Sequence, residues 1–489
     1  MTRPTSTLAA EAALALSTLA EANRQVHARF PGDRGARQPV HVVYGGAHLF
    51  RATTPRKMGA LALAALAEHA PDAFALADAL ALPGHELLPV ENAARGALLE
   101  AMEHDEGEAL RHERPQLWLP LAVHRRVAAK LAREPVEDYR IDFEDGFGVR
   151  PDAEEDEHAV RAARELALAV KSDEAPPFVG MRIKSLGLET TARAVRTLDL
   201  FVTTLVHELG GLPPAFVVTL PKITSPAQPA TLAALFERLE TRLGLAPRAL
   251  KMELMVELTQ TIFDPEGRIA LPRLLEASDG RCTGAHFGSY DYTASCDVTA
   301  AWQSMTHPAC AFALQVTKNA LAGTGVFLSD GATTVMPVGV HRAREGEALT
   351  PAQRAENTAA VHAAWRLMAS NVTASLRNGF YQGWDLHPAQ IPVRYAATYA
   401  FFLESLAPAA ERLRRFVDEA AKASLVGDVF DDAATGQGLL NHFLRGLGSG
   451  AFSERDLAST GLSADEVRTR SFPRILAGRT RAAAAAAPH

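Results

Sequence analysis

Short apolar runs alternate with helical stretches along most of this chain. In Lys251–Leu258, apolar residues occupy every second position, and Glu253 and Glu257 lie between them. A period of two is typical of a β-strand that has one face in a core. A helical stretch follows, and then a second strand-like run that ends shortly before Asp291. Glu257 and Asp291 therefore come at the ends of two successive predicted strands.

Eight such runs can be counted from residue 115 onward, each followed by helical sequence. They are Leu117–Val123, Asp138–Gly148, Pro177–Ser185, Phe216–Ile223, Lys251–Leu258, Cys282–Gly288, Gly325–Gly331 and Tyr381–Ile391. Strands that alternate with helices form parallel sheets, and eight of them favour a closed barrel over an open sheet. We therefore predict an α/β fold with a TIM (β/α)8 barrel over residues 115–395.

The remaining sequence predicts helical additions to the barrel. Residues 1–114 form a mostly helical N-terminal extension with one short β-like run, Val40–Phe50, and residues 396–489 form a helical C-terminal region or lid. No Gly/Ser-rich or Pro-rich linker separates the extension from the barrel, so we expect it to pack on the barrel. We expect the extension and the loop-like insertion 333–350 to surround the mouth or an oligomer interface. A narrowed mouth would favour small free acids over CoA thioesters.

Composition narrows the classes of partner. The 489 residues carry a net charge of −7, which argues against a nucleic-acid partner, and 47% of them are hydrophobic, as in ordinary soluble proteins. No apolar run approaches the length of a membrane span. The three cysteines are too few and too widely spaced for a disulfide framework or a zinc cluster. We expect a cytoplasmic protein with free thiols and no membrane partner.

Charged residues gather where the predicted strands end. They are Asp142, Glu144, Asp145, Arg182, Lys184, Lys222, Glu257, Asp291 and His387. In a parallel barrel these strand ends share one mouth. The two convergent carboxylates of Glu257 and Asp291 suit Mg²⁺, which takes oxygen ligands and keeps several waters. The alternative is that both are solvated acids at loop ends.

Six blocks of the sequence resemble the citrate lyase β-subunit-like superfamily, which includes malyl-CoA lyases and related 2-oxo-acid aldolases, with malate synthases more distant. The blocks here read DFEDGF, MRIKS, LPKI, MVELTQTI, GSYDYTA and HPAQI. The family's blocks look like DLEDAV, VRIN, LPK, ETPxxI, GxEDxxA and IHPxQI. All six occur in the family's order, across roughly residues 115–395.

The resemblance implies a Mg²⁺-dependent carbon–carbon lyase or aldolase that works through an enolate. A 2-oxo acid would chelate the metal, and the substrate would be a 2-hydroxy or 3-hydroxy acid or its CoA thioester. Glu257 and Asp291 stand at the family's metal ligands, and we expect a homo-oligomer. Two alternatives remain: a CoA-thioester hydrolase or synthase on the same scaffold, and a catalytically silent barrel that binds a metabolite.

The resemblance also assigns roles around the metal. Arg182 would grip the carboxylate or keto group of the substrate through its planar fork, unless it forms a buried structural salt bridge. Glu144 and Asp145 would hold metal-bound waters or Arg182. Lys222 would pair with Glu257 or Asp145, or contact the substrate. The substrate-binding segment would be Gly288, Ser289 and Tyr290.

The chain departs from the family pattern at two positions. The proline of ETP is missing from Glu257-Leu258-Thr259, and Tyr290 stands where the family has a glutamate. In relatives the base can be an aspartate from a C-terminal lid, for which Asp428, Asp431 and Asp432 are candidates here, unless they form a solvated acidic turn. We expect His387 to shape the last strand-to-helix turn rather than to transfer protons.

Overall fold

Eight parallel strands form a closed barrel in sequence order, with β1 beside β8, in the computed structural model of the chain. The structure describes residues 8, 11–32, 37–344, 346–426 and 433–486. The strands are β1 (His41–Gly46), β2 (Asp138–Asp142), β3 (Phe178–Arg182), β4 (Phe216–Leu220), β5 (Lys251–Val256), β6 (Cys282–Phe287), β7 (Phe327–Ala332) and β8 (Gln382–Trp384). The predicted TIM barrel is confirmed, and all the carboxyl ends of its strands open at one mouth.

Helices cover the outside of the barrel. From β2 onward they are α7 (Asp152–Lys171), α8 (Thr191–Leu209), α9 (Ala227–Leu243), α10 (Thr259–Ile262), α11 (Leu271–Ala277), α12 (Ser289–Ser295), α13 (Pro308–Leu321), α14 (Pro351–Arg377) and α15 (Ile391–Glu404). The alternation in β5 follows from this arrangement. Met252, Leu254 and Val256 are buried in the hydrophobic core, whereas Glu253 contacts polar groups inside the barrel.

The first strand of the barrel is not the predicted one. Leu117–Val123 is part of a helix, α6 (Pro115–Arg133), and Val40–Phe50 contains β1, which pairs with both β2 and β8. The run Leu117–Val123 is apolar throughout because α6 is buried among other helices, with contacts to α3, α5 and α15. A short apolar run does not by itself distinguish a buried helix from a buried strand. The barrel therefore begins near residue 41 rather than at residue 115.

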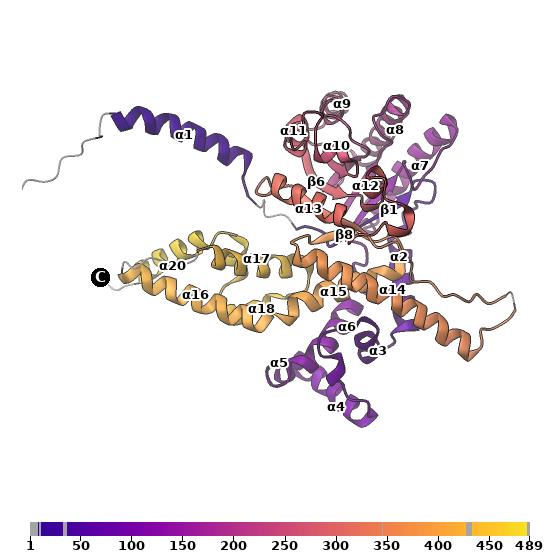
Figure 1. Cartoon of the computed structure of the whole chain (residues 1–489), viewed down its shortest axis with the longest axis vertical. Coiled ribbons are helices and arrows are strands. Elements are labelled where there is room, and N and C mark those ends of the chain that lie inside the picture. Colours follow the sequence, from indigo (N-terminus) through magenta and orange to yellow (C-terminus); the bar gives the residue numbers. More distant parts are fainter. Residues whose placement is uncertain (1–7, 9–10, 33–36, 345, 427–432, 487–489) are drawn as a thin grey trace, which may run out of the picture.

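Most of the predicted extension is a helical segment inserted between β1 and β2. Its helices are α2 (Thr54–His69), α3 (Ala73–Leu80), α4 (Asn92–Glu103), α5 (Glu108–Glu113) and α6. α6 packs along α15, and α3 packs against α14, so this segment shares the core of the barrel helices. α1 (Glu11–Arg29) differs, because Figure 1 shows it extending away from the rest of the chain and most of its described residues are exposed.

The C-terminal region is helical, as predicted. It consists of α16 (Leu406–Val426), α17 (Ala433–Ser449), α18 (Glu454–Leu457), α19 (Ala464–Arg468) and α20 (Phe472–Ala486). α17 packs against α15 and α16. The insertion 333–350 runs outward to the start of α14 in Figure 1, where the backbone N–H of His341 donates to Asn357. Among the described residues of the insertion, Thr334 hydrogen-bonds to Tyr290 of the predicted site. Figure 1 shows the insertion running away from the barrel beyond this point, which does not support a cover over the mouth, and a place at an oligomer interface stays a prediction.

The cysteines are free thiols, as expected from their number and spacing. Cys282, Cys296 and Cys310 are free, and the first and last are buried.

No single helix in the described ranges is long and apolar enough to cross a membrane. The helices α2 and α3, which are bent by 90° relative to each other, would be long and apolar enough only when taken together.

Candidate active site at the barrel mouth

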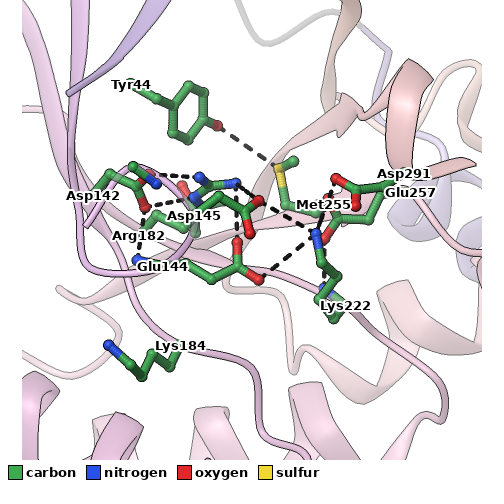
Figure 2. A network of polar contacts seen from close by, with 12 residues as sticks. Tyr44, Asp142, Glu144, Asp145, Arg182, Lys184, Lys222, Met255, Glu257 and Asp291 are labelled. Carbon is green, nitrogen blue, oxygen red and sulfur yellow. Dashed lines mark hydrogen bonds and ion pairs between the residues drawn. The ribbon is translucent and has the colours of Figure 1, made fainter. Parts of the chain in front are cut away.

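The ends of β2 to β6 bring seven charged side chains together at the mouth (Figure 2). They are Asp142, Glu144 and Asp145 from the end of β2 and the turn after it, Arg182 at the end of β3, Lys222 after β4, Glu257 after β5 and Asp291 in the first turn of α12. All six charged residues that were predicted to act in catalysis or metal binding are in this group. The seventh is Asp142, the first residue of the DFEDGF block, for which no role was predicted.

The ammonium of Lys222 lies among four of these carboxylates (Figure 2). Its Nζ is 2.9 Å from Asp291 Oδ2 and 3.2 Å from Glu257 Oε2. It is also 3.4 Å from Asp145 Oδ2 and 3.7 Å from Glu144 Oε1. The sequence left two roles open for Lys222, pairing with acids and contact with the substrate. The structure shows the pairing with acids.

The backbone of Lys222 also serves Glu257. Its φ of 49° lies in the left-handed region, which is unfavourable for a residue with a side chain and is often retained at functional sites. In this conformation the N–H of Lys222 donates to Glu257 Oε1 at 2.6 Å while Nζ faces Glu257 Oε2. One residue therefore holds both oxygens of a carboxylate whose side chain is fully buried.

The planar fork of Arg182 is occupied by Asp142. Nε donates to Asp142 Oδ1 at 2.7 Å and Nη2 donates to Oδ2 at 2.6 Å, and both side chains are buried. The remaining nitrogen, Nη1, lies 3.0 Å from Glu144 Oε2 and 3.5 Å from Asp145 Oδ2. The structure thus contains the buried salt bridge that was the alternative for Arg182, and it leaves Nη1 as the nitrogen nearest the acids of the mouth.

Negative charge exceeds positive charge at the mouth, because five carboxylates surround Arg182 and Lys222. Burial raises the pKa of Glu144 to about 8; Arg182 and Lys222 oppose this shift, and Glu257 and Asp145 add to it. Burial also raises the pKa of Glu257, opposed by Lys222 and reinforced by Asp291. A bound cation would relieve this excess of negative charge.

Two of the carboxylates fit a magnesium ion. In the described part of the chain, no group of three His, Cys, Asp or Glu side chains is arranged to hold a metal. Mg²⁺, however, is often bound by only one or two carboxylates, together with waters and substrate oxygens. Glu257 and Asp291 meet this requirement because they already share one cation, the ammonium of Lys222, in a site with surplus negative charge.

The three residues predicted to bind substrate, Gly288–Tyr290, have different surroundings. Gly288 allows β6 to approach β5, since a Cβ there would lie 2.7 Å from Glu257 Cβ. The hydroxyl of Ser289 is buried and has no hydrogen-bond partner within the described residues. Tyr290 Oη instead accepts a hydrogen bond from Thr334 N at 3.2 Å, so this side chain contacts the insertion. The Ser289 hydroxyl lies next to β7, since a Cβ at Gly331 would be 2.1 Å from Ser289 Oγ.

A polar layer under the mouth was missed in the sequence analysis. The Arg182 guanidinium carbon lies 4.9 Å from the ring centroid of Tyr44, which belongs to β1. The Tyr44 ring also packs on Trp384, with ring centroids 4.5 Å apart. Tyr44 Oη lies 3.1 Å from Glu253 Oε1 and 3.0 Å from His286 Nδ1 inside the barrel. The alternation of β1 could have indicated that Tyr44 faces inward, but only if that run had been assigned to the barrel.

Three further predictions concern residues around this group. Lys184 points away from the acids of the mouth and pairs with Glu155 at 2.8 Å (Figure 2). His387 caps the turn after β8 by accepting a hydrogen bond from Ala389 N, which confirms its predicted structural role. The candidate bases Asp428, Asp431 and Asp432 lie outside the described residues.

Comparison with known families gives one match over most of the chain. A family model described as a domain of unknown function, DUF6986, matches residues 19–475. No curated protein matches the chain.

Several solved structures are similar to the chain. The Haloferax volcanii malate synthase magnesium/glyoxylate complex is 15% identical over 57% of this chain and 70% of that chain, with a TM-score of 0.39. The citrate lyase β-subunit from M. tuberculosis with oxaloacetate and magnesium is 16% identical over 57% and 93%, with a TM-score of 0.34. An HpcH/HpaI aldolase/citrate lyase family protein from Burkholderia cenocepacia is 15% identical over 43% and 76%, with a TM-score of 0.29.

Proposed function

We propose that this chain, which belongs to the DUF6986 family, is a Mg²⁺-dependent carbon–carbon lyase or aldolase acting on a small 2-oxo or hydroxy acid. The observation that carries the proposal is the convergence of Glu257 and Asp291 on a single cation position at the mouth of the barrel. The active sites of enzymes with this fold lie at this end of the barrel, built from residues after several different strands.

Glu257 and Asp291 would hold the metal. When bound, Mg²⁺ supplies a Lewis acid that polarises the carboxylate and keto oxygens of a 2-oxo acid. The two ligands differ in their surroundings: Glu257 is fully buried, whereas Asp291 is 44% exposed. Glu257 would therefore fix the position of the site, and Asp291 would face the solvent side of the mouth.

Arg182 and Lys222 would bind the acidic groups of the substrate. Asp142 fixes the Arg182 guanidinium through Nε and Nη2, which leaves Nη1 to meet a substrate carboxylate. Glu144 lies between the two cations, 3.0 Å from Arg182 Nη1 and 3.7 Å from Lys222 Nζ. A substrate carboxylate that approaches both cations would compete with Glu144 for them.

Ser289 would complete the substrate site. A buried hydroxyl without a partner is costly, by about 1–3 kcal/mol, and a ligand oxygen that accepts its hydrogen bond would remove that cost. Gly331 of β7 leaves space for the Ser289 hydroxyl, since a Cβ at Gly331 would lie 2.1 Å from Ser289 Oγ. A hydroxyl fixed in this way can donate to the oxygen on which charge develops as a carbon–carbon bond breaks.

The experiment is an activity screen with a metal control. Carbon–carbon cleavage and condensation are measured with glyoxylate, pyruvate and oxaloacetate, with and without a CoA thioester, in Mg²⁺ and in EDTA. We expect turnover with at least one 2-oxo acid, dependence on Mg²⁺ and loss in Asp291→Asn. Glu237→Gln, which changes an exposed carboxylate on α9, should keep full activity. Turnover that persists in EDTA or in Asp291→Asn would contradict the proposal.

A further inference from the structure

Two adjoining cavities lie at the end of the barrel opposite the mouth. Their volumes are about 390 Å³ and 600 Å³, and Gln38, Tyr381 and Arg445 line both. Gln38 precedes β1 and Tyr381 precedes β8, so both residues mark the amino ends of strands. The cavities are therefore separated from the proposed active site by the length of the barrel.

Basic side chains dominate the walls of these cavities, although the chain as a whole carries a net charge of −7. Five arginines and one lysine line the larger cavity, against two glutamates. Three of these cations already pair with carboxylates: Arg37 and Lys130 with Glu134 and Glu137, and Arg468 with Glu454 and Asp465. Among the described residues that line the smaller cavity, Lys318 and Arg445 are charged and none is an aspartate or glutamate.

Lys318 and Arg445 lie against the same aromatic ring. The Arg445 guanidinium carbon is 4.9 Å from the centroid of Tyr381, and Lys318 Nζ is 6.0 Å from it. Arg445 Nη1 donates to Gln38 Oε1 at 2.9 Å, and Lys318 Nζ donates to the carbonyl oxygen of Gly379. In the part of the chain that the structure describes, Lys318 pairs with no carboxylate. Two like charges are thus held beside one cavity.

A purely structural role does not account for Lys318. It lies in the last turn of α13, where a cation is stabilised by the helix dipole and its pKa would rise. Instead, burial and the charge of Arg445 lower the pKa of Lys318 to about 8. Among the described residues, no carboxylate pairs with the charge of Lys318, which lies beside the cavity.

We propose that Lys318 and Arg445, with Gln38 and Tyr381, form a binding site for a small oxyanion with two negative charges, such as a phosphate ester or a dicarboxylate. Both cations would donate charge-assisted hydrogen bonds to its oxygens. Because Lys318 belongs to α13 and Arg445 belongs to α17, the ligand would link the barrel to the C-terminal helices. This site is independent of the proposed activity at the mouth.

Binding of inorganic phosphate and of succinate, measured by calorimetry in metal-free buffer, tests the proposal and separates the two kinds of ligand. We expect saturable binding of at least one of them, weakened about tenfold in Lys318→Met, which corresponds to about 1.4 kcal/mol, because the variant loses one charge-assisted hydrogen bond. Lys57→Met, which removes an exposed lysine from α2, should bind like the wild type. No saturable binding in the wild type, or equal affinity in Lys318→Met, would overturn the proposal.

A second measurement needs no variant. The amines of the wild-type protein are labelled with an amine-reactive ester near pH 8, and peptide mapping gives the rate at each lysine. We expect phosphate or succinate to slow labelling of Lys318 several-fold relative to chloride at equal ionic strength, while Lys57 is unaffected. Equal rates at Lys318 in all three salts would place the anion elsewhere and contradict the site.

Discussion

Lys222 Nζ lies 2.9 Å from Asp291 Oδ2 and 3.2 Å from Glu257 Oε2, so it contacts both carboxylates at once. The position at which the two proposed metal ligands can share a cation is thus held by an ammonium of the chain itself. A Mg²⁺ ion that binds these two carboxylates must compete with Lys222 for their oxygens.

Lys222→Met should therefore bind Mg²⁺ more tightly than the wild type. The substitution removes the competing charge, and we expect affinity to rise about tenfold, which corresponds to about 1.4 kcal/mol. Turnover should fall, because the substrate loses a cation. Calorimetry with Mg²⁺ checks the first effect, with Lys57→Met as the control, and weaker metal binding in Lys222→Met would mean that the ammonium supports the site.

The two metal ligands should differ in what their loss does to stability. Asp291→Ala changes a half-exposed side chain and should leave the urea midpoint almost unchanged. Glu257→Ala leaves the backbone N–H of Lys222 without its acceptor, which should cost about 1–3 kcal/mol. Equal urea midpoints for the two variants would be inconsistent with the buried contact.

Arg182→Lys should lose both stability and activity. Lysine cannot reproduce the two parallel hydrogen bonds to Asp142, so we expect a loss of about 1–3 kcal/mol in unfolding free energy and a large fall in kcat/KM. Arg281→Lys is the matched control, because Arg281 is equally buried and also donates two hydrogen bonds to one carboxylate, from Nη1 and Nη2 to Glu240, away from the mouth. Arg281→Lys should lose stability and keep kcat/KM. Parallel losses of kcat/KM in the two variants would make Arg182 purely structural.

The pH dependence of stability should report the buried carboxyl of Glu144. Its pKa is about 8 in the folded protein and about 4.3 in an unfolded chain. Between these values the folded state binds a proton that the unfolded state does not, so this group makes the metal-free protein less stable as pH rises through that window. Glu144→Gln should reduce this loss, whereas Glu237→Gln should not. Thermal unfolding from about pH 5 to about pH 8 measures it, and curves that stay parallel for Glu144→Gln and the wild type would refute it.

The sequence was sufficient for the barrel and for the acids at its mouth, because strand ends can be recognised from alternation and from the polar residues that follow. It was insufficient for the first strand. Leu117–Val123 and Val40–Phe50 are both short and apolar, and only the tertiary neighbours distinguish the buried helix from the strand.

Pairings within the site were harder to predict than its members. Whether Arg182 meets a substrate or Asp142 depends on the register between β2 and β3, which places these two residues directly opposite each other. The position of the Lys222 side chain depends on a left-handed backbone conformation. A lysine in the sequence does not indicate this conformation, as a glycine would. The contribution of Tyr44 was invisible once its strand had been assigned to the extension.

A crystal structure with Mn²⁺ in place of Mg²⁺, with the metal located by its anomalous scattering, tests directly whether Glu257 and Asp291 bind the metal. We predict one strong peak at the mouth, bound by Glu257 and Asp291, with Lys222 Nζ no longer between these two carboxylates. A mouth without such a peak, in which Lys222 still bridges Glu257 and Asp291 at saturating Mn²⁺, would contradict the account.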